Sequence, residues 1–128
     1  MRGCREGGLQ GGTYTMLISC LRDLLEAQVL CGEDRLDEDV ATVFASDMMS
    51  DVLACPDEIQ GVLTGLVNSQ VIRTADMMDI GLIIFVRGKC PPTDVVEMAR
   101  QRDMVVMVTA CRMFSACGRL YEAGLGER

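Results

Sequence analysis

Two carboxylates stand four residues apart in the stretch Ser46–Asp51, which reads SDMMSD. On a helix, Asp47 and Asp51 would share one face, where they could hold Mg²⁺ or act as an acid–base pair. Acidic residues near a helix start also have an ordinary role, because they cap the helix and favour the positive end of its dipole. The ordinary role is the commoner one, so we assign no metal ligand here.

Glycine and polar residues follow two expected strands, as Thr64-Gly65 and as Arg87-Gly88-Lys89. Ligands of open parallel sheets lie outside the carboxyl ends of the strands, where helix N-termini offer free N–H groups and partial positive charge. We therefore expect this edge to bind a small anionic ligand, such as a nucleotide. The same residues also suit plain turns, since glycine after a strand is common, and then the loops would hold no ligand.

The ligand hypothesis gives different roles to the backbone and to the charged side chains. Backbone N–H groups would hold a phosphate, Arg87 or Lys89 would neutralise its charge, and Asp47 would take a hydroxyl group or a metal ion. The candidate ligand-binding residues are Ser46, Asp47, Ser50, Thr64, Gly65, Asn68, Arg87, Gly88 and Lys89.

Several catalytic classes lack their usual residues. The chain has no histidine, which removes the commonest general base and the Ser-His and Cys-His pairs. It also has no P-loop motif and no dinucleotide fingerprint after a strand, so we expect no enzymatic activity and no cofactor. The seven cysteines include no C-x-x-C pair, which favours reduced thiols over a zinc site. With the ten methionines, they would suit an anaerobic host.

Net charge and apolar run length limit the partners. A net charge of -7 and a pI of about 4.5 argue against nucleic acid and anionic membrane, because both need a basic face. The longest apolar runs, Leu82–Val86 and Met104–Val108, are far shorter than the ~20 residues that span a bilayer. No leader sequence is evident, so we expect a cytoplasmic protein.

The 128 residues fit a single domain. Residues 1–15 are rich in glycine and show no periodicity, so we expect a disordered extension there and a domain over residues 16–128. The spacing of apolar residues predicts a helix from Ser19 to Ala27, a turn at Cys31–Asp34 and a strand at Val40–Ala45. A short helix should then begin at Ser46 or Asp47 and end before Pro56.

The rest of the chain repeats one unit. Expected strands end at Thr64, Val86 and Val108, so the spacing is 22 residues twice. Helices are expected between them, one capped by Asn68, one begun by a capping box of Asp94 and Glu97, and a last one after the third strand. This βαβαβ pattern predicts an α/β fold, a three-layer α/β/α sandwich with a mostly parallel sheet.

Three stretches carry a family resemblance: FASDMMSDVLA (44–54), LTGLVNSQVIRTADMMDIGLIIFVRGK (63–89) and FSACGRLYEAGL (114–125). They resemble the DRTGG-domain family, in particular its stand-alone members, which are similar to the N-terminal domain of HPr kinase/phosphorylase. Asn68-Ser69 and Val86-Arg87-Gly88 stand where related domains often carry Asp-Arg and Thr-Gly-Gly. The resemblance implies an α/β sensory or accessory domain, often fused to nucleotide-binding or regulatory modules.

Three functions are thus under consideration. The first is a non-catalytic regulatory or sensory domain that binds a small anionic ligand or nucleotide. The second is a protein–protein interaction or accessory module with no small ligand, which would form a homodimer or dock a redox enzyme or regulator. The third is a phosphotransferase acting through Asp47 and Asp51, which the missing motifs disfavour.

Overall fold

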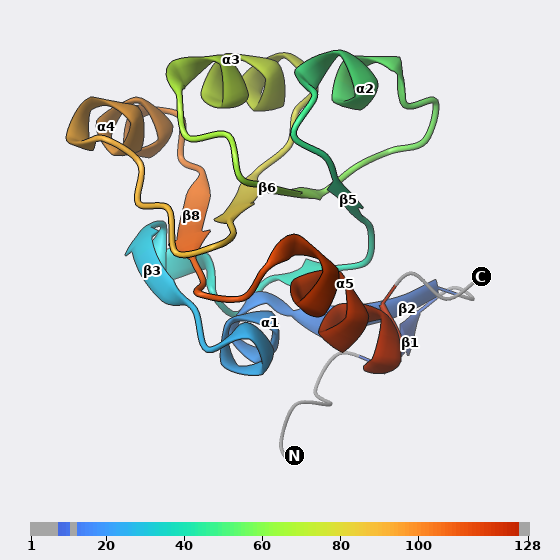
Figure 1. The fold of residues 1–128 in the computed structure, drawn as a ribbon. Helices are drawn as coiled ribbons and strands as arrows, with labels where there is room; N and C mark the ends of the chain where they lie inside the picture. The colour runs from blue at the N-terminus through green and yellow to red at the C-terminus, as the bar shows by residue number, and fades with distance from the viewer. Residues whose placement is uncertain (1–7, 11–12, 126–128) are drawn as a thin grey trace.

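The computed structural model describes residues 8–10 and 13–125, which form two sheets (Figure 1). The main sheet has five strands in the order β3-β8-β7-β6-β5, and all its neighbours are parallel except β3, which is antiparallel to β8. A smaller antiparallel sheet has the order β1-β2-β4. The strands are β1 (Gly8–Gln10), β2 (Thr13–Leu17), β3 (Gln28–Cys31), β4 (Asp39–Val40), β5 (Val43–Ala45), β6 (Gly61–Thr64), β7 (Leu82–Phe85) and β8 (Val105–Val108).

Helices cover both faces of the main sheet. Figure 1 shows α2, α3 and α4 on one side of it and α1 and α5 on the other, beside the small sheet. The predicted three-layer α/β/α sandwich with a mostly parallel sheet is therefore confirmed. The helices are α1 (Ile18–Leu25), α2 (Met49–Ala54), α3 (Ser69–Met77), α4 (Thr93–Gln101) and α5 (Met113–Glu122), and a 3-10 turn, η1, spans Glu33–Arg35.

The central strands are apolar throughout because each face of the sheet has its own core. Successive side chains of β7 alternate, so Ile83 and Phe85 pack against α2, α3 and α4, and Ile84 packs against α1 and α5. All three side chains are fully buried. Burial of such large apolar groups stabilises the fold, and it fixes where each strand ends and which loops meet.

The first and second strands of the main sheet differ from the prediction. The expected turn at Cys31–Asp34 is wrong at its start, because Gln28–Cys31 is strand β3, paired with β8 through a register shift between Val29 and Cys31. The exposed Gln28 and this irregularity obscure the strand pattern. The expected strand Val40–Ala45 is two strands, since Val40 pairs with Met16 of β2 and Val43–Ala45 pairs with β6.

The starts of α1 and α4 also differ from the prediction. Helix α1 begins after Leu17 with no side-chain cap, so Ser19 lies inside it. Helix α4 begins after Pro92, again without a side-chain cap, and the capping box of Asp94 and Glu97 is wrong. Proline supplies the fixed backbone angle that a helix start needs, which replaces the cap. Asn68 does cap α3 as expected, because its Oδ1 accepts the N–H of Gln70 at 3.0 Å.

The two ends of the described chain meet. Of the expected extension 1–15, residues 1–7 and 11–12 lie outside the described residues, and its described parts belong to the paired strands β1 and β2. Gly124, after α5, has a φ of +111° and lies against the ring of Tyr14, which a Cβ there would approach within 2.9 Å. A left-handed backbone and this close approach both require glycine.

Candidate functional site

The carboxyl ends of three parallel strands bring the predicted site residues to one edge. Ala45 of β5 pairs with Leu63 of β6, and Thr64 pairs with Phe85 of β7, so these strands end side by side. The loops that follow therefore start together. Asp47, Thr64 with Gly65, and Arg87 come from three of these chain segments and make direct contact.

Asp47 is the centre of this cluster. Its Oδ1 accepts the backbone N–H of Gly65 at 2.7 Å and the hydroxyl of Thr64 at 3.3 Å, and its Oδ2 lies 3.6 Å from a guanidinium nitrogen of Arg87. The Gly65 N–H, followed by the Thr64 hydroxyl and the Arg87 charge, holds the pKa of Asp47 below its ordinary value. Burial acts in the opposite direction and is outweighed. Asp47 is thus an ionised carboxylate held by a backbone N–H, a hydroxyl and a guanidinium.

Arg87 reaches this carboxylate from a left-handed backbone. Its φ is 65° and that of Gly88 is 66°, so two successive residues turn the chain away from the sheet after β7. The turn is tied to the loop after β8, because Arg87 N–H donates to Cys111 O at 2.7 Å and Gly88 N–H to Thr109 O at 2.8 Å. The guanidinium of Arg87 lies directly over Gly65, where any side chain would collide with it. The left-handed conformation is unfavourable for arginine and needs these contacts to persist.

The backbone N–H groups of these loops are already used. Gly65 N–H donates to Asp47, Leu66 N–H to the Thr64 hydroxyl at 3.1 Å, and Lys89 N–H to Val86 O at 3.3 Å. Together with those of Arg87 and Gly88, they have internal acceptors. An anion at these residues would therefore rely mainly on side chains, and a backbone contact to phosphate stays a prediction.

The other predicted residues surround the cluster at different distances from it. The hydroxyl of Ser46 accepts Met48 N–H at 2.9 Å and closes a turn, and Asn68 is the α3 cap. Ser50 is exposed on α2 and Lys89 is exposed after Gly88. Among the described residues neither side chain has a partner, so Lys89 is a second open cation near Arg87.

Asp47 and Asp51 do not form the pair that their spacing suggested. Helix α2 begins at Met49, with Met48 as its N-cap, so Asp47 lies before the helix and turns toward β6. No group of three or more potential metal ligands occurs within residues 8–10 and 13–125. Thr64, the only hydroxyl on Asp47, is fully buried and cannot reach a substrate. Asp47 and Asp51 are therefore not arranged as the paired acids of the phosphotransferase hypothesis.

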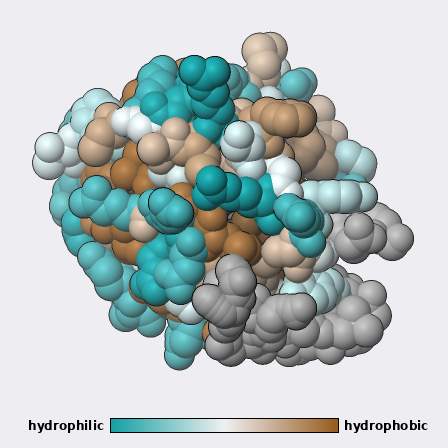
Figure 2. Space-filling view, turned by 60° about the horizontal axis from the view of Figure 1, so that its bottom comes forward, coloured by the Kyte–Doolittle hydropathy of each residue, from teal (hydrophilic) through white to brown (hydrophobic). Residues whose placement is uncertain are grey.

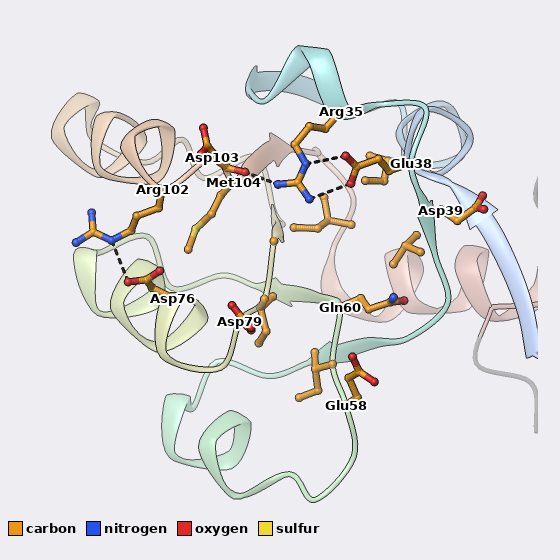
Figure 3. A pocket seen from close by; sticks show the side chains of 16 residues that line it. Arg35, Glu38, Asp39, Glu58, Gln60, Asp76, Asp79, Arg102, Asp103 and Met104 are labelled. Carbon is orange, nitrogen blue, oxygen red and sulfur yellow. Dashed lines mark hydrogen bonds and ion pairs between the residues drawn. The ribbon is translucent and has the colours of Figure 1, made fainter.

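A polar cavity of about 360 Å³ lies at the opposite, amino edge of the sheet, where no site was predicted (Figure 3). Its arginines are engaged: Arg35 donates to both oxygens of Glu38, at 2.9 and 3.1 Å, and to the carbonyl of Asp103. Arg102 pairs with Asp76 at 3.3 Å. Charge pairing raises the pKa of Arg35 and lowers that of Glu38.

The open groups of this cavity are mostly carboxylates. In Figure 3, Glu58 and Asp79 lie across the cavity from Arg35 without a marked partner. Helices α3 and α4 end here, with Asp79 and Asp103 in the left-handed conformation, and so add the negative ends of their dipoles. The cavity would repel an anion. No local sequence pattern signalled it, since its residues come from the ends of many elements.

An apolar groove of about 400 Å³ runs between the edge strand β5 and helix α5. Phe114, Cys117, Gly118 and Tyr121 of α5 line it, and Phe114 is 90% exposed and Tyr121 60%. Figure 2 turns the side of α1 and α5 forward and shows apolar surface between hydrophilic side chains. Sequence analysis placed a last helix after the third strand but did not assign its apolar sides.

The described cysteines are free thiols. Burial raises the pKa of the Cys31 and Cys117 thiols, which keeps them protonated and unreactive at neutral pH. Cys31 also donates its S–H to Met104 O at 3.4 Å. Cys31 acts as a small core residue, and Cys117 is partly buried at the edge of the other core.

Comparison with known proteins supports the fold. No family model and no curated protein matches the chain. Among solved structures, it is similar to the CBS and DRTGG domains of the regulatory region of Clostridium perfringens pyrophosphatase, complexed with its activator diadenosine tetraphosphate. The TM-score is 0.63 and the identity 18%, and the match covers 80% of this chain and 45% of the other. The likeness supports a DRTGG-like fold and does not bear on HPr kinase specifically.

No helix within the described residues is both long and apolar enough to cross a membrane.

Proposed function

We propose that this chain is a non-catalytic regulatory domain that binds a small anionic ligand, with nucleotides as the first candidates, at the carboxyl edge of its sheet. The observation that carries the proposal is the contact of Asp47 with Arg87 above Gly65. There a carboxylate from the chain itself occupies a site with a guanidinium, a hydroxyl and a backbone N–H. The fold likeness to a regulatory region crystallised with a nucleotide activator supports the choice of ligand class.

We expect the ligand to bind through the guanidinium of Arg87. Arg87 has five N–H donors. Among the described residues its ion-pair partner is Asp47, and the two charged groups are a rather long 3.6 Å apart. The side chains of Arg87 and Asp47 are 41% and 48% exposed, so a phosphate can approach the guanidinium from solvent. Lys89 follows two residues later and would add a second charge. Asp47 then competes with the ligand for Arg87.

This competition gives the proposal opposite expectations for two variants. Arg87→Ala should abolish anion binding, and Asp47→Asn should strengthen it, because it frees the guanidinium. The probes are ATP, GTP, NAD⁺, diadenosine tetraphosphate and a sugar phosphate, each in a thermal-shift assay of the reduced protein. Ligand at 100 times its dissociation constant adds about 2.7 kcal/mol. For a domain of this size, the midpoint should rise by roughly 10 °C.

The matched control is Arg73→Ala, which removes an exposed cation from α3, on a different part of the surface. It should leave any shift unchanged. A shift that persists in Arg87→Ala would place the site elsewhere, and no shift with any probe would remove the anion proposal.

A second candidate is the interaction module. The exposed rings of Phe114 and Tyr121 beside an apolar groove favour it, because solvated helices rarely gather such side chains on one stripe. The two functions use different surfaces. A homodimer and a redox or regulatory protein are both partners to be tested, and the cytoplasmic location and an anaerobic host stay predictions.

A further inference from the structure

Helix α5 has two apolar sides, and the described residues of the chain cover only one of them. Ala116 and Leu120 are buried in the core between α5 and the sheet. Phe114, Cys117, Gly118 and Tyr121 follow the spacing i, i+3, i+4, i+7 and form a second stripe that faces the groove beside β5. We call these four residues the α5 stripe. One apolar side is enough to attach a surface helix, so the second needs another explanation.

The α5 stripe is symmetric about its own centre. Phe114 lies three residues before Cys117, and Tyr121 lies three residues after Gly118. Large side chains thus stand at both ends and small ones in the middle. A helix of the same sequence that crosses in the antiparallel direction meets a matching surface, with Phe114 of each copy facing Tyr121 of the other. This is the self-complementarity that a twofold interface requires.

Gly118 permits a close crossing at the centre. A Cβ built at Gly118 would have no neighbouring atom within 4 Å, so nothing inside the described chain requires glycine there. Glycine in a helix interior costs about 1 kcal/mol relative to alanine. The benefit is on the outer side, where the missing side chain lets a second backbone approach.

Charge favours the same arrangement. Arg112, at the N-cap of α5, and Glu122, its last residue, have opposite charges at opposite ends of the stripe. Neither side chain has an ion-pair partner among the described residues. In an antiparallel pair, the Arg112 end of each α5 would lie beside the Glu122 end of the other, whereas a parallel pair would place like charges at the same end.

We propose that the α5 stripe and the adjoining groove are the interface of a symmetric homodimer, in which α5 packs antiparallel on α5 of a second copy. The inference develops the interaction candidate above and does not depend on the anion site. The exposed fractions of Phe114 and Tyr121 are 90% and 60%. Aromatic side chains of ~200 Å² then let four rings bury roughly 600 Å² of the ~1,600 Å² in a standard interface. The groove walls at β5 supply further apolar surface.

The test is sedimentation of the full reduced chain over a range of concentrations. We expect a monomer–dimer equilibrium whose dissociation constant rises at least tenfold in Phe114→Ser and in Gly118→Arg. Phe114 is almost fully exposed and Gly118 has open space around it, so both variants should keep the wild-type circular dichroism spectrum. Met77→Ser is the matched control, because Met77 is 72% exposed on α3, and it should leave the constant unchanged.

A charge exchange tests the direction of packing. Arg112→Glu alone should weaken the dimer, and Arg112→Glu combined with Glu122→Arg should restore it. Failure of the double variant to recover would overturn the antiparallel arrangement. A chain that stays monomeric at its highest soluble concentration would overturn the proposal, as would a dimer insensitive to Phe114→Ser and Gly118→Arg. Arg87→Ala should leave dimerisation intact, which separates this inference from the anion site.

Discussion

At the residue scale, Asp47 has a structural role and, in the proposed anion site, would compete with the ligand. It connects the loop after β5 to β6 through Gly65 and Thr64, and it also neutralises Arg87. A ligand that takes Arg87 away from Asp47 would loosen the ion pair but leave both hydrogen bonds in place. In the proposed site, ligand binding and loop stability would therefore be coupled through one carboxylate.

The same carboxylate gives a pH dependence. Because folding lowers the pKa of Asp47 below its ordinary 3.8, its stabilising effect is fully present above that value. The effect is lost as pH falls through the lowered pKa of the folded state. We expect Asp47→Asn to lower the free energy of unfolding by about 1 kcal/mol at pH 7, a modest value for a half-exposed group.

Urea unfolding at pH 7 and at stepwise lower pH measures this difference. The gap between wild type and Asp47→Asn should narrow on the acid side of 3.8. Asp57→Asn, which changes an exposed acid in the loop between α2 and β6, is the control and should show no comparable gap. A gap that stays constant down to low pH would mean that the charge of Asp47 contributes nothing.

At the element scale, two glycines have opposite roles. Gly32 joins β3 to η1 with a φ of +86°, and a Cβ there would lie 2.6 Å from the Cα of Val105 and 2.8 Å from Met104 O. Gly118 sits in α5 with open space around it. One position requires glycine and the other does not, although the sequence around each looks unremarkable.

We expect Gly32→Ala to lower the free energy of unfolding by about 2 kcal/mol or more, because backbone strain and a backbone collision add. Gly118→Ala should leave stability unchanged or raise it by about 0.5–1 kcal/mol in the monomer. Urea unfolding at low protein concentration compares the two. Equal effects of the two substitutions on the free energy of unfolding would contradict the different roles assigned to Gly32 and Gly118.

How far the sequence predicts these elements depends on how regular each one is. The strand–helix units from Gly61 to Gln101 were predicted, because continuous apolar strands and a 22-residue period leave few alternatives. Strand β3 was missed because its pattern is mixed and its pairing partner, β8, lies more than 70 residues away. Long-range antiparallel pairing leaves no period to detect.

The candidate site, too, could be predicted from the sequence only in part. Asp47 and Arg87 are 40 residues apart, and the expected parallel sheet was enough to place both at one edge. Whether their loops offered free N–H groups depended on individual hydrogen bonds, such as that of Arg87 N–H to Cys111 O. The cavity at the amino edge is assembled from single residues at many element ends, and no short motif records it.

At the scale of the whole molecule, the two edges of the sheet differ in charge. The carboxyl edge presents Arg87 and Lys89, and the amino edge presents a cavity rimmed by carboxylates. The net charge of -7 is thus unevenly distributed, which would direct an anion away from the cavity and toward one edge. Binding there should weaken as salt screens this field.

The two cores should nevertheless unfold together, because one sheet supplies a side of each. Ile83 lies in the core with α2–α4 and Ile84 in the core with α1 and α5. We expect Ile83→Ala and Ile84→Ala each to cost about 2–5 kcal/mol, as for other buried large-to-small changes. Far-ultraviolet and near-ultraviolet circular dichroism should report one and the same unfolding transition in each variant. Separate transitions would show that the two layers fold independently.

The contact of Tyr14 with Gly124 has a consequence for protein architecture. Gly8, the first described residue, pairs with Thr15 next to Tyr14, so the first and last described segments lie close together. A host protein could therefore accept a domain that begins near Gly8 and ends near Leu125 within one of its own surface loops without its flanking segments being pushed apart. The fold can thus be spliced into a longer chain as a cassette, and any strain that ligand binding produces in it would reach the host through a single narrow junction.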